Sequence, residues 1–400
     1  MSTPLRTAII GTGFMGRMHA NAWRNAPRFF DLPRRPEAVV LAGSDGDRAA
    51  AAAERYGIPS SSDDWRSVVA RDDIDVVDIC TPGDTHAEIA LAALAAGKHV
   101  LCEKPLANGT ADADRMADAA HEAASRGVVA MCGFSYRRTP ALALARTLIA
   151  AGRLGDIRHV RAQYLQDWLV DREAPYTWRL DRERAGSGAL GDIGAHSIDT
   201  AQWLTGSLVT DVSAVTRTFV AERPRLDERV GLGGRAGADA ERERVTVDDA
   251  AAFTATFSDG ALGVFEATRM ATGHRNANRI EVDGELGSIA FDFSHLNDLL
   301  FADATLPADE QGFRRIDVTE AAHPYAGAWW PAGHGLGYEH LFTHQVVDFV
   351  RAVAGETDAR PSFDDAAQVQ RVLDAVARSA ASDSVRTPVE IRTRTEGELS

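Results

Sequence analysis

Near its start the chain reads Thr7-Ala8-Ile9-Ile10-Gly11-Thr12-Gly13-Phe14-Met15-Gly16, a short apolar run followed by the pattern Gly-x-Gly-x-x-Gly. The apolar run predicts a buried strand, and a helical pattern is expected from about Met15. Between these elements Gly11 would allow a tight turn, Gly13 would let the backbone approach a pyrophosphate, and Gly16 would let helix and strand pack closely. The amides at the helix start would face the phosphates. This context favours dinucleotide binding over an ordinary strand-to-helix turn.

Strands and helices alternate along the first third of the chain. Short apolar runs predict strands, and alanine-rich segments that end near a glycine predict helices. Such alternation is typical of a doubly wound parallel sheet, so we predict an α/β fold with a Rossmann domain over residues 1–134. The further strands are expected at 37–42, 75–80, 99–102 and 128–132, and the further helices at 47–56, 85–96 and 112–125.

The pattern changes after residue 134. Runs of period two become common, and Ser258-Asp259-Gly260 and Asp283-Gly284 are typical of hairpin turns. We therefore predict an α+β domain over residues 135–400, built on a mainly antiparallel sheet. The stretch 223–244 is rich in glycine and charge, has no periodicity and predicts a mobile loop. Strands are expected at 157–164, 251–257, 263–267, 279–282, 288–291 and 388–391, and helices at 141–151 and 193–204.

Composition narrows the function classes. The 400 residues suggest two domains, and 45% hydrophobic with 25% charged residues is typical of a soluble globular chain. A formal net charge of −15 argues against nucleic acid as a partner, and no apolar run is long enough to span a membrane. Cys80, Cys102 and Cys132 show no Cys-x-x-Cys spacing, which argues against zinc and against a disulfide framework. With no leader pattern at the N-terminus, we predict a cytoplasmic protein.

The end of the second strand bears on the choice between NAD and NADP. An acidic residue at the strand tip binds the ribose of NAD, whereas small or basic residues there favour NADP. If Gly43 lies at the tip, Ser44 follows it and Arg48 is placed to reach a phosphate. If Asp45 reaches back, NAD is favoured. Both cofactors stay open, and Arg48 is also compatible with a solvated helix position.

Two segments carry groups suited to alcohol oxidation. Lys104 follows the strand 99–102 and should stand at the cofactor face, where an ammonium can bind a hydroxyl and stabilise a developing alkoxide. Asp192 and His196 are four residues apart, so on a helix they share one face. A histidine can accept a proton near neutral pH, and a carboxylate can orient it. Other roles stay open: Lys104 as a solvated loop residue, His196 as a core residue, and Asp192 with His196 as half of a metal site.

Several motifs along the chain belong together. They are Gly11–Gly16, Cys80-Thr81-Pro82 with His86, Gly97-Lys98-His99-Val100, Cys102-Glu103-Lys104-Pro105-Leu106 and Gly188–Asp199. In combination they resemble the Gfo/Idh/MocA oxidoreductase family over nearly the whole chain, and 28–33 and 323–334 resemble a branch acting on sugars. The resemblance implies a Rossmann domain followed by a domain with a large open sheet, which binds substrate and mediates oligomerisation. It also implies hydride transfer between NAD or NADP and a secondary alcohol of a sugar, anhydrosugar or cyclitol.

The resemblance implies roles for individual residues. Lys104 would hold the substrate hydroxyl, His196 would act as the base, and Asp192 would orient it or bind the sugar. Asp199 would support them from a neighbouring helix face. The candidate cofactor-binding residues are Gly11, Gly13, Phe14, Met15, Gly16, Ser44, Asp45, Arg48, Thr81, Pro82, His86, Glu103 and Lys104. The candidate substrate-binding residues are Lys104, Tyr136, Gln163, Trp178, Asp192, His196 and His334.

Two rival functions stay open. Some members of the family resemble glycosidases that use tightly held NAD without net redox change. The same fold also suits a non-catalytic nucleotide-sensing protein, because a fold does not determine a function. The joint presence of Lys104, Asp192 and His196 argues against the sensor.

The pair His340 and His344, beside Glu339, is the best rival metal constellation. We favour an amphipathic helix over 341–350 with both histidines at its rim, and we expect no metal. A homodimer or homotetramer is expected to cover the open sheet, because bare apolar faces are liabilities.

Overall fold

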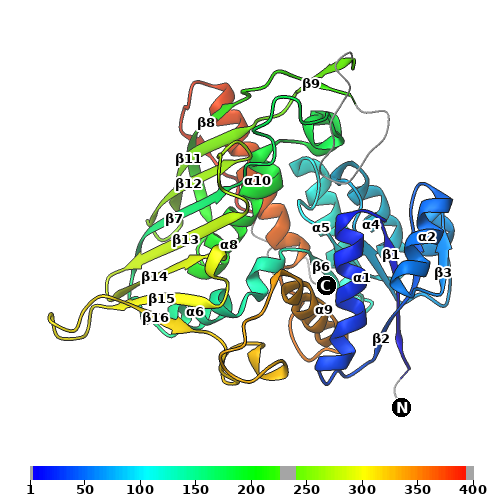
Figure 1. Ribbon diagram of the computed structural model, residues 1–400, viewed down its shortest axis with the longest axis horizontal. Helices are drawn as coiled ribbons and strands as arrows, with labels where there is room; N and C mark the ends of the chain where they lie inside the picture. Colours follow the sequence, from blue (N-terminus) through cyan, green and yellow to red (C-terminus); the bar gives the residue numbers. More distant parts are fainter. Residues whose placement is uncertain (1–2, 226–239, 393–400) are drawn as a thin grey trace.

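A parallel sheet forms the N-terminal part of the computed structural model, which describes residues 3–225 and 240–392 (Figure 1). The strands are β1 (Leu5–Ile10), β2 (Pro36–Ala42), β3 (Ser60–Ser62), β4 (Val76–Ile79), β5 (His99–Cys102) and β6 (Ala130–Cys132). The helices are α1 (Phe14–Phe29), α2 (Gly46–Tyr56), α3 (Trp65–Val69), α4 (His86–Ala95) and α5 (Thr110–Ala124). The strand order β3-β2-β1-β4-β5-β6 is that of a doubly wound sheet, so the predicted Rossmann fold is confirmed.

The second sheet is larger and mainly antiparallel, as predicted. Its strands are β7 (Ile157–Leu165), β8 (Val209–Arg217), β11 (Ala250–Phe257), β12 (Leu262–Thr268), β13 (Ala277–Gly284), β14 (Gly287–Asp292), β15 (Asp298–Asp303), β16 (Phe313–Asp317) and β17 (Thr387–Pro388). Their order is β16-β15-β14-β13-β7-β12-β11-β8-β17, and only β7 and β12 pair in parallel among these strands. Helices α6 (Pro140–Ala150), α8 (Ala195–Thr205) and α10 (Phe363–Ala381) pack on the face that looks toward the first sheet (Figure 1).

Side-chain alternation decides which face of the second sheet is buried. In β12, Gly263, Phe265 and Ala267 are buried, whereas Leu262 and Val264, which alternate with them, are exposed. Successive side chains of a strand point to opposite faces, so the first set packs toward the helices and the second set lies on the outer face.

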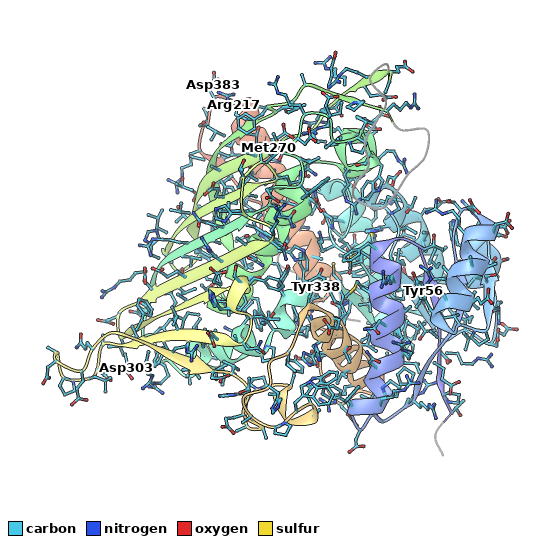
Figure 2. The ribbon with its side chains drawn as sticks, viewed as in Figure 1. Tyr56, Arg217, Met270, Asp303, Tyr338 and Asp383 are labelled. Carbon is cyan, nitrogen blue, oxygen red and sulfur yellow. The ribbon has the colours of Figure 1, made fainter. Side chains whose placement is uncertain are left out.

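The last two long helices join the two sheets. Helix α9 (Tyr338–Val353) packs on α1, and α10 packs on α5. Tyr338, the first residue of α9, lies between the two sheets (Figure 2). The division of the chain after residue 134 stays a prediction, because these helices follow the second sheet in sequence yet help to cover the first. Among the described residues, no helix is long and apolar enough to cross a membrane.

Two expectations about the second half need correction. The predicted loop 223–244 is ordered at both ends, where β9 (Glu222–Pro224) and β10 (Arg242–Arg244) form an antiparallel ribbon. Arg223 anchors this ribbon, because its buried guanidinium donates hydrogen bonds to the carbonyls of Leu169 and Asp171. The middle of that loop, 226–239, lies outside the described residues. The strand expected at 388–391 is the short β17 instead.

Candidate active site

The glycine loop between β1 and α1 leaves room for a phosphate group. Gly11 has φ +125°, and a Cβ there would lie 2.5 Å from the carbonyl oxygen of Cys80. A Cβ at Gly16 would lie 1.8 Å from the oxygen of Gly11, so these two glycines are required by packing. A Cβ at Gly13 would meet nothing within 4 Å, and no side chain caps α1. The first amides of α1, from Phe14 onward, are therefore available to an anion.

The tip of β2 carries glycine rather than an acid. Gly43 follows the strand directly, and a Cβ there would lie 2.7 Å from the side chain of Thr12. Ser44 and Asp45 are exposed, and the Asp45 carboxylate accepts a hydrogen bond from the amide of Arg48 at 3.0 Å. Asp45 thus serves as the N-cap of α2.

Two candidate cofactor residues are held inside the protein. The ring nitrogens of His86 lie 2.9 Å from the carbonyl oxygen of Thr81 and 3.0 Å from that of Pro105. His86 therefore ties together the loops that follow β4 and β5, the first of which includes Pro82. The Glu103 side chain is 4% exposed and lies against His19, with 3.0 Å between Oε1 and Nε2. Contact of His86 and Glu103 with the cofactor stays a prediction.

Lys104, Asp192 and Arg269 form a charged cluster. The Lys104 ammonium donates a hydrogen bond to the Asp192 carbonyl oxygen at 2.6 Å, and it lies 3.7 Å from the carboxylate oxygen Oδ1. The fully buried guanidinium of Arg269 is 3.5 Å from the other oxygen, Oδ2. Burial alone would raise the pKa of Asp192, but Lys104, Arg269 and Arg179 outweigh it and hold the pKa below its ordinary value. Asp192 is therefore a carboxylate at neutral pH.

A π-helical turn presents Asp192 to this cluster. Residues Leu190–Gly194 form that turn and run directly into α8, so the regular helical spacing expected for Asp192 and His196 is widened here. Asp248 caps the turn: its two carboxylate oxygens accept the amides of Gly188 at 2.7 Å and Leu190 at 2.8 Å. No local sequence pattern points to Asp248, because it lies 60 residues from the amide of Gly188 that it caps.

We expect Asp248→Ala to lower the free energy of unfolding by about 2–3 kcal/mol, because two buried amides would lose their acceptor. Urea denaturation of the purified chain would measure this loss. Asp248→Asn keeps one acceptor oxygen, so its free energy of unfolding should fall by about half as much as that of Asp248→Ala. Asp309→Ala, at an exposed position, is the control. A change below about 0.5 kcal/mol for Asp248→Ala would contradict the capping role.

His196 is placed to act as a neutral base. It is 8% exposed, and its Nδ1 has no hydrogen-bond partner among the described residues. The ring packs edge-on against Tyr136, with 4.8 Å between centroids. Burial, with a further contribution from the Lys104 ammonium, lowers the pKa of His196 well below its ordinary value of 6.5. The imidazole is therefore uncharged at neutral pH and able to accept a proton.

Tyr136 belongs to a hydrogen-bonded chain of side chains. Its hydroxyl lies 2.6 Å from that of Tyr164, which donates to Asn276 at 2.8 Å. Gln163 takes no part in these hydrogen bonds. It points to the opposite face of β7 and donates to Glu266 at 3.1 Å. Side chains alternate between the two faces of β7, so Tyr164 shares its face with the buried Val160, while Gln163 lies on the other face. This alternation could have distinguished the two residues from sequence.

Other candidates lie outside the charged cluster. The Trp178 ring stacks under the guanidinium of Arg179 at 4.5 Å, in a short turn before the π-helical segment. The exposed ring of His334 lies 2.9 Å from the carbonyl oxygen of Pro331. Asp199 is buried and accepts hydrogen bonds from Arg137, at 2.9 Å for Nε.

The two histidines of α9 do not share the helix rim. His344 is fully buried, 2.9 Å from the Arg138 carbonyl, and its other ring nitrogen accepts the Trp329 indole N–H at 2.7 Å. His340 is partly buried and stays near the helix start. Within the described residues, the one group of side chains close enough to share an ion is His19, Asp78 and Cys80.

Known families match both parts of the chain. Residues 5–134 match the description "Oxidoreductase family, NAD-binding Rossmann fold", and residues 142–290 match "GFO/IDH/MocA C-terminal domain". The chain belongs to the Gfo/Idh/MocA family. It is therefore an NAD-binding oxidoreductase, as the glycine loop and the Rossmann sheet indicate.

Individual members of the Gfo/Idh/MocA family are similar over nearly their whole length. Levoglucosan dehydrogenase from Pseudarthrobacter phenanthrenivorans is 42% identical over 95% of this chain and 97% of its own. A solved structure of levoglucosan dehydrogenase with NADH and levoglucosan superimposes with a TM-score of 0.90 and 41% identity, covering 97% of this chain and 100% of that one. An oxidoreductase domain protein from Kribbella flavida gives a TM-score of 0.92 and 56% identity, covering 98% and 100%.

Proposed function

We propose that this chain oxidises a secondary alcohol of a sugar, an anhydrosugar or a cyclitol with NAD or NADP as the hydride acceptor. One observation carries the proposal. The Lys104 ammonium contacts Asp192 at the carboxyl edge of the first sheet, and the neutral His196 lies near enough for that ammonium to lower its pKa. The similarity to levoglucosan dehydrogenase supports the substrate class and makes levoglucosan the first compound to test.

Each group of the cluster has its own task. Lys104 would donate a hydrogen bond to the reacting hydroxyl and stabilise its negative charge as the O–H bond breaks. His196 would accept that proton at a ring nitrogen. Asp192 would hold the ammonium and accept a hydrogen bond from the substrate. Bound nicotinamide supplies the acceptor for the hydride of the carbinol carbon, so the products are a ketone, the reduced cofactor and a proton.

The glycine loop fits the cofactor. The space at Gly13 and the uncapped start of α1 suit a pyrophosphate, and exposed Phe14 is placed beside it as an apolar wall. We propose NAD as the preferred cofactor, supported by the NADH complexes of levoglucosan dehydrogenase. The end of β2 does not decide the choice, because Gly43 stands at its tip and Asp45 and Arg48 at the start of α2 carry opposite charges.

Aromatic side chains support a sugar pocket. Tyr136 contacts the His196 ring edge-on, and Trp178 lies in the turn that precedes the Asp192 segment. Such rings present an apolar face to the C–H groups of a pyranose, while hydroxyl and indole groups bind its oxygens. We propose that Tyr136 and Trp178 line the sugar pocket. Gln163 is not included, because it faces the other side of the sheet.

Absorbance at 340 nm of the purified chain would test the function. Levoglucosan, pyranoses and inositols would be offered with NAD and with NADP separately. A substrate-dependent rise would support the dehydrogenase, and its size with each cofactor would decide between them. Binding of either cofactor without any rise, but with release of aryl groups from aryl glycosides, would instead support the NAD-assisted glycosidase.

The outer face of the second sheet suggests self-association. Val264 on β12 and Leu300 on β15 are 41% and 38% exposed, and both line one hollow of this face. Around them lie charges of both signs, including Arg161, Glu281 and Arg315, lining a hollow of about 690 Å³. A patch with apolar residues and both charges can be complementary to itself across a two-fold axis. We therefore propose a homodimer or homotetramer that buries this face.

Multi-angle light scattering is expected to show a dimer or tetramer for the wild type and a monomer for Val264→Asp/Leu300→Asp. Each introduced carboxylate would occur twice in an isologous interface, and burying it in place of an apolar side chain costs free energy. Leu286→Asp, in the exposed turn between β13 and β14, should leave the mass unchanged. A monomeric wild type at micromolar concentration would contradict this proposal.

We also propose a cytoplasmic location. Cys80, Cys102 and Cys132 are all free and buried, as is usual for proteins of reducing compartments. Fractionation of the native host with an antibody to the chain would test it, and recovery with secreted proteins would contradict it.

A further inference from the structure

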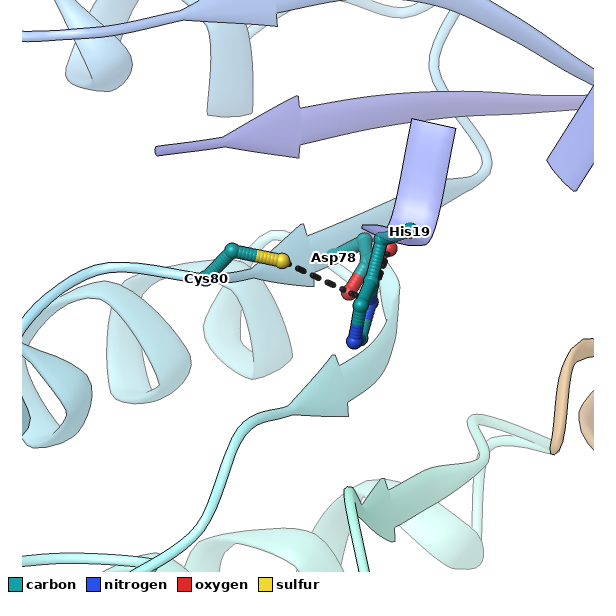
Figure 3. Close-up of side chains that lie close together, drawn as sticks. All are labelled: His19, Asp78 and Cys80. Atoms are coloured by element: carbon teal, nitrogen blue, oxygen red, sulfur yellow. Dashed lines mark hydrogen bonds and ion pairs between the residues drawn. The ribbon is translucent and has the colours of Figure 1, made fainter. Parts of the chain in front are cut away.

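A buried histidine lies between two carboxylates directly behind the active site. His19, on α1, is 1% exposed, and its Nδ1 lies 2.9 Å and 2.8 Å from the two oxygens of Asp78 on β4. Its Nε2 lies 3.0 Å from Oε1 of Glu103, the residue before Lys104. Figure 3 shows His19 against Asp78, with Cys80 beside them. None of these groups takes part in the proton transfer proposed above.

The geometry of this network requires a donor at both ring nitrogens. A neutral imidazole has one N–H, so one of the two carboxylates would face a lone pair, whereas an imidazolium donates to both. Burial alone would lower the pKa of His19, but the adjacent Asp78 outweighs it, so the pKa is raised well above its ordinary value. From α9, only the apolar ring of Phe342 packs on the imidazole among the contacts described, at 5.7 Å.

The remaining oxygens of the network are also engaged. The Trp23 indole donates to Oδ2 of Asp78 at 2.6 Å, and the backbone amide of Lys104 donates to Oε2 of Glu103 at 3.3 Å. Gly133 lies close beside the Glu103 carboxylate, since a Cβ at that position would come within 2.6 Å of its Oε1. The position of Glu103 is therefore coupled to the turn that carries Lys104.

The network joins three segments that surround the cofactor site. His19 follows the glycine loop on α1, Asp78 lies two residues before Cys80 and the loop after β4, and Glu103 leaves β5. Bringing these segments into register places the Lys104 ammonium at its 2.6 Å contact with the Asp192 carbonyl. A displacement of a catalytic group by about 1 Å can cost about 100-fold in rate.

We propose that His19 is a positioning residue of the reaction: as a cation shared by Asp78 and Glu103, it fixes the turn that presents Lys104 to the substrate. The inference rests on the proposed dehydrogenase function.

A metal ion is the competing explanation for this group. His19, Asp78 and Cys80 offer ligand atoms within 4.8 Å of one another. However, the His19 ring already lies between two carboxylates, with 2.8 Å from Nδ1 to Asp78 and 3.0 Å from Nε2 to Glu103. Oδ2 of Asp78 already accepts the Trp23 indole N–H. The hydrogen-bonded network therefore accounts for the arrangement better than an ion.

The test combines kinetics with a spectroscopic measurement on the full chain. His19→Gln can donate to one carboxylate but turns its carbonyl oxygen toward the other. We expect kcat to fall by about 30–100-fold, with NADH binding, followed by fluorescence, changed by less than about threefold. Glu103→Gln provides a carboxamide that can donate to that oxygen, so the double variant should recover about tenfold over His19→Gln. His121→Gln, on the outer helix α5, is the matched control.

The protonation of His19 is measured independently of any substrate. Nitrogen-15 NMR of histidine-labelled wild type at neutral pH should show one ring with both nitrogens protonated, absent from His19→Gln. If His19→Gln does not fold, this measurement and the kcat of Asp78→Asn still decide, because that kcat is expected to fall while NADH binding is retained.

Several results would overturn the inference. They are a neutral His19 ring, a kcat within about threefold of wild type in His19→Gln, no recovery in the double variant, or a stoichiometric metal ion that Cys80→Ala removes. Failure of the proposed function looks different, because the wild type would then be inactive on every sugar while the doubly protonated ring was still observed.

Discussion

Lys104→Met is expected to lower kcat for sugar oxidation by about 10³-fold or more, because it removes the ammonium that stabilises the developing alkoxide. Methionine keeps the length and most of the volume of lysine, so packing beside Pro105 should be retained. The substitution has a second effect on charge. Lys104 is the largest of the charges that lower the pKa of Asp192, so the carboxylate should bind a proton more readily without it.

Steady-state kinetics at 340 nm with levoglucosan, beside NADH binding measured by fluorescence, would check this prediction. NADH affinity should change far less than kcat, because the pyrophosphate is held at the glycine loop. Lys104→Arg keeps the charge but replaces a compact ammonium with a planar fork, so it should also lose most of the activity. The chain has only one other lysine, Lys98, whose ammonium is engaged by the carbonyls of Arg71 and Ile74. Activity of Lys104→Met within about tenfold of wild type would rule out the assigned role.

His196→Asn is expected to lower kcat by about 10²–10⁴-fold, the usual contribution of a positioned general base. The wild type should also show a defined pH dependence. Because burial and Lys104 lower the pKa of His196, the ring stays neutral and active until the pH falls well below 6.5. The rate of sugar oxidation should therefore fall only at pH values well below 6.5, where the imidazole becomes protonated and can no longer accept the substrate proton.

Profiles of log kcat against pH for wild type and His196→Asn would check both statements. The acidic decline should be present in the wild type and absent from the variant. His121→Asn, on α5, serves as a control for loss of an unrelated histidine. A wild-type profile that already falls above pH 7 as the solution is acidified would contradict a lowered pKa for His196.

Much of the fold follows from local sequence. The apolar run 7–10, its glycine loop and the alternating segments up to residue 134 each depend on near neighbours, and all of them appear in the first sheet. The hairpin turn predicted at 258–260 joins antiparallel neighbours, whereas the turn expected at 283–284 lies two residues later, at 285–286, between β13 and β14. A strand without a hydrophobic pattern is not predicted from the sequence. Ser60–Ser62 forms β3 through pairing with β2, although its three serines carry no hydrophobic signal.

The site divides in the same way. Gly11, Lys104 and His196 are predicted from motif and position. Gly11 and Lys104 follow strands of the parallel sheet, whose carboxyl edge gathers such residues. Gln163 is predicted as a substrate contact, whereas the alternation of β7 within the sheet puts its neighbour Tyr164 on the buried face beside Tyr136. Asp248 lies 60 residues from the amide of Gly188 that it caps, so no local pattern connects the two.

The sequence by itself therefore determines the Rossmann sheet and the dinucleotide loop and predicts the candidate catalytic groups, because short-range patterns encode them. Only the tertiary structure decides their charge states and positions. Arg269 and Lys104 make Asp192 a carboxylate, and burial makes His196 neutral. The pKa of His19 is raised because α1 packs its ring against Asp78, which is 59 residues away in sequence. Protonation depends on burial and on charges close in space, and both arise only when distant segments pack together.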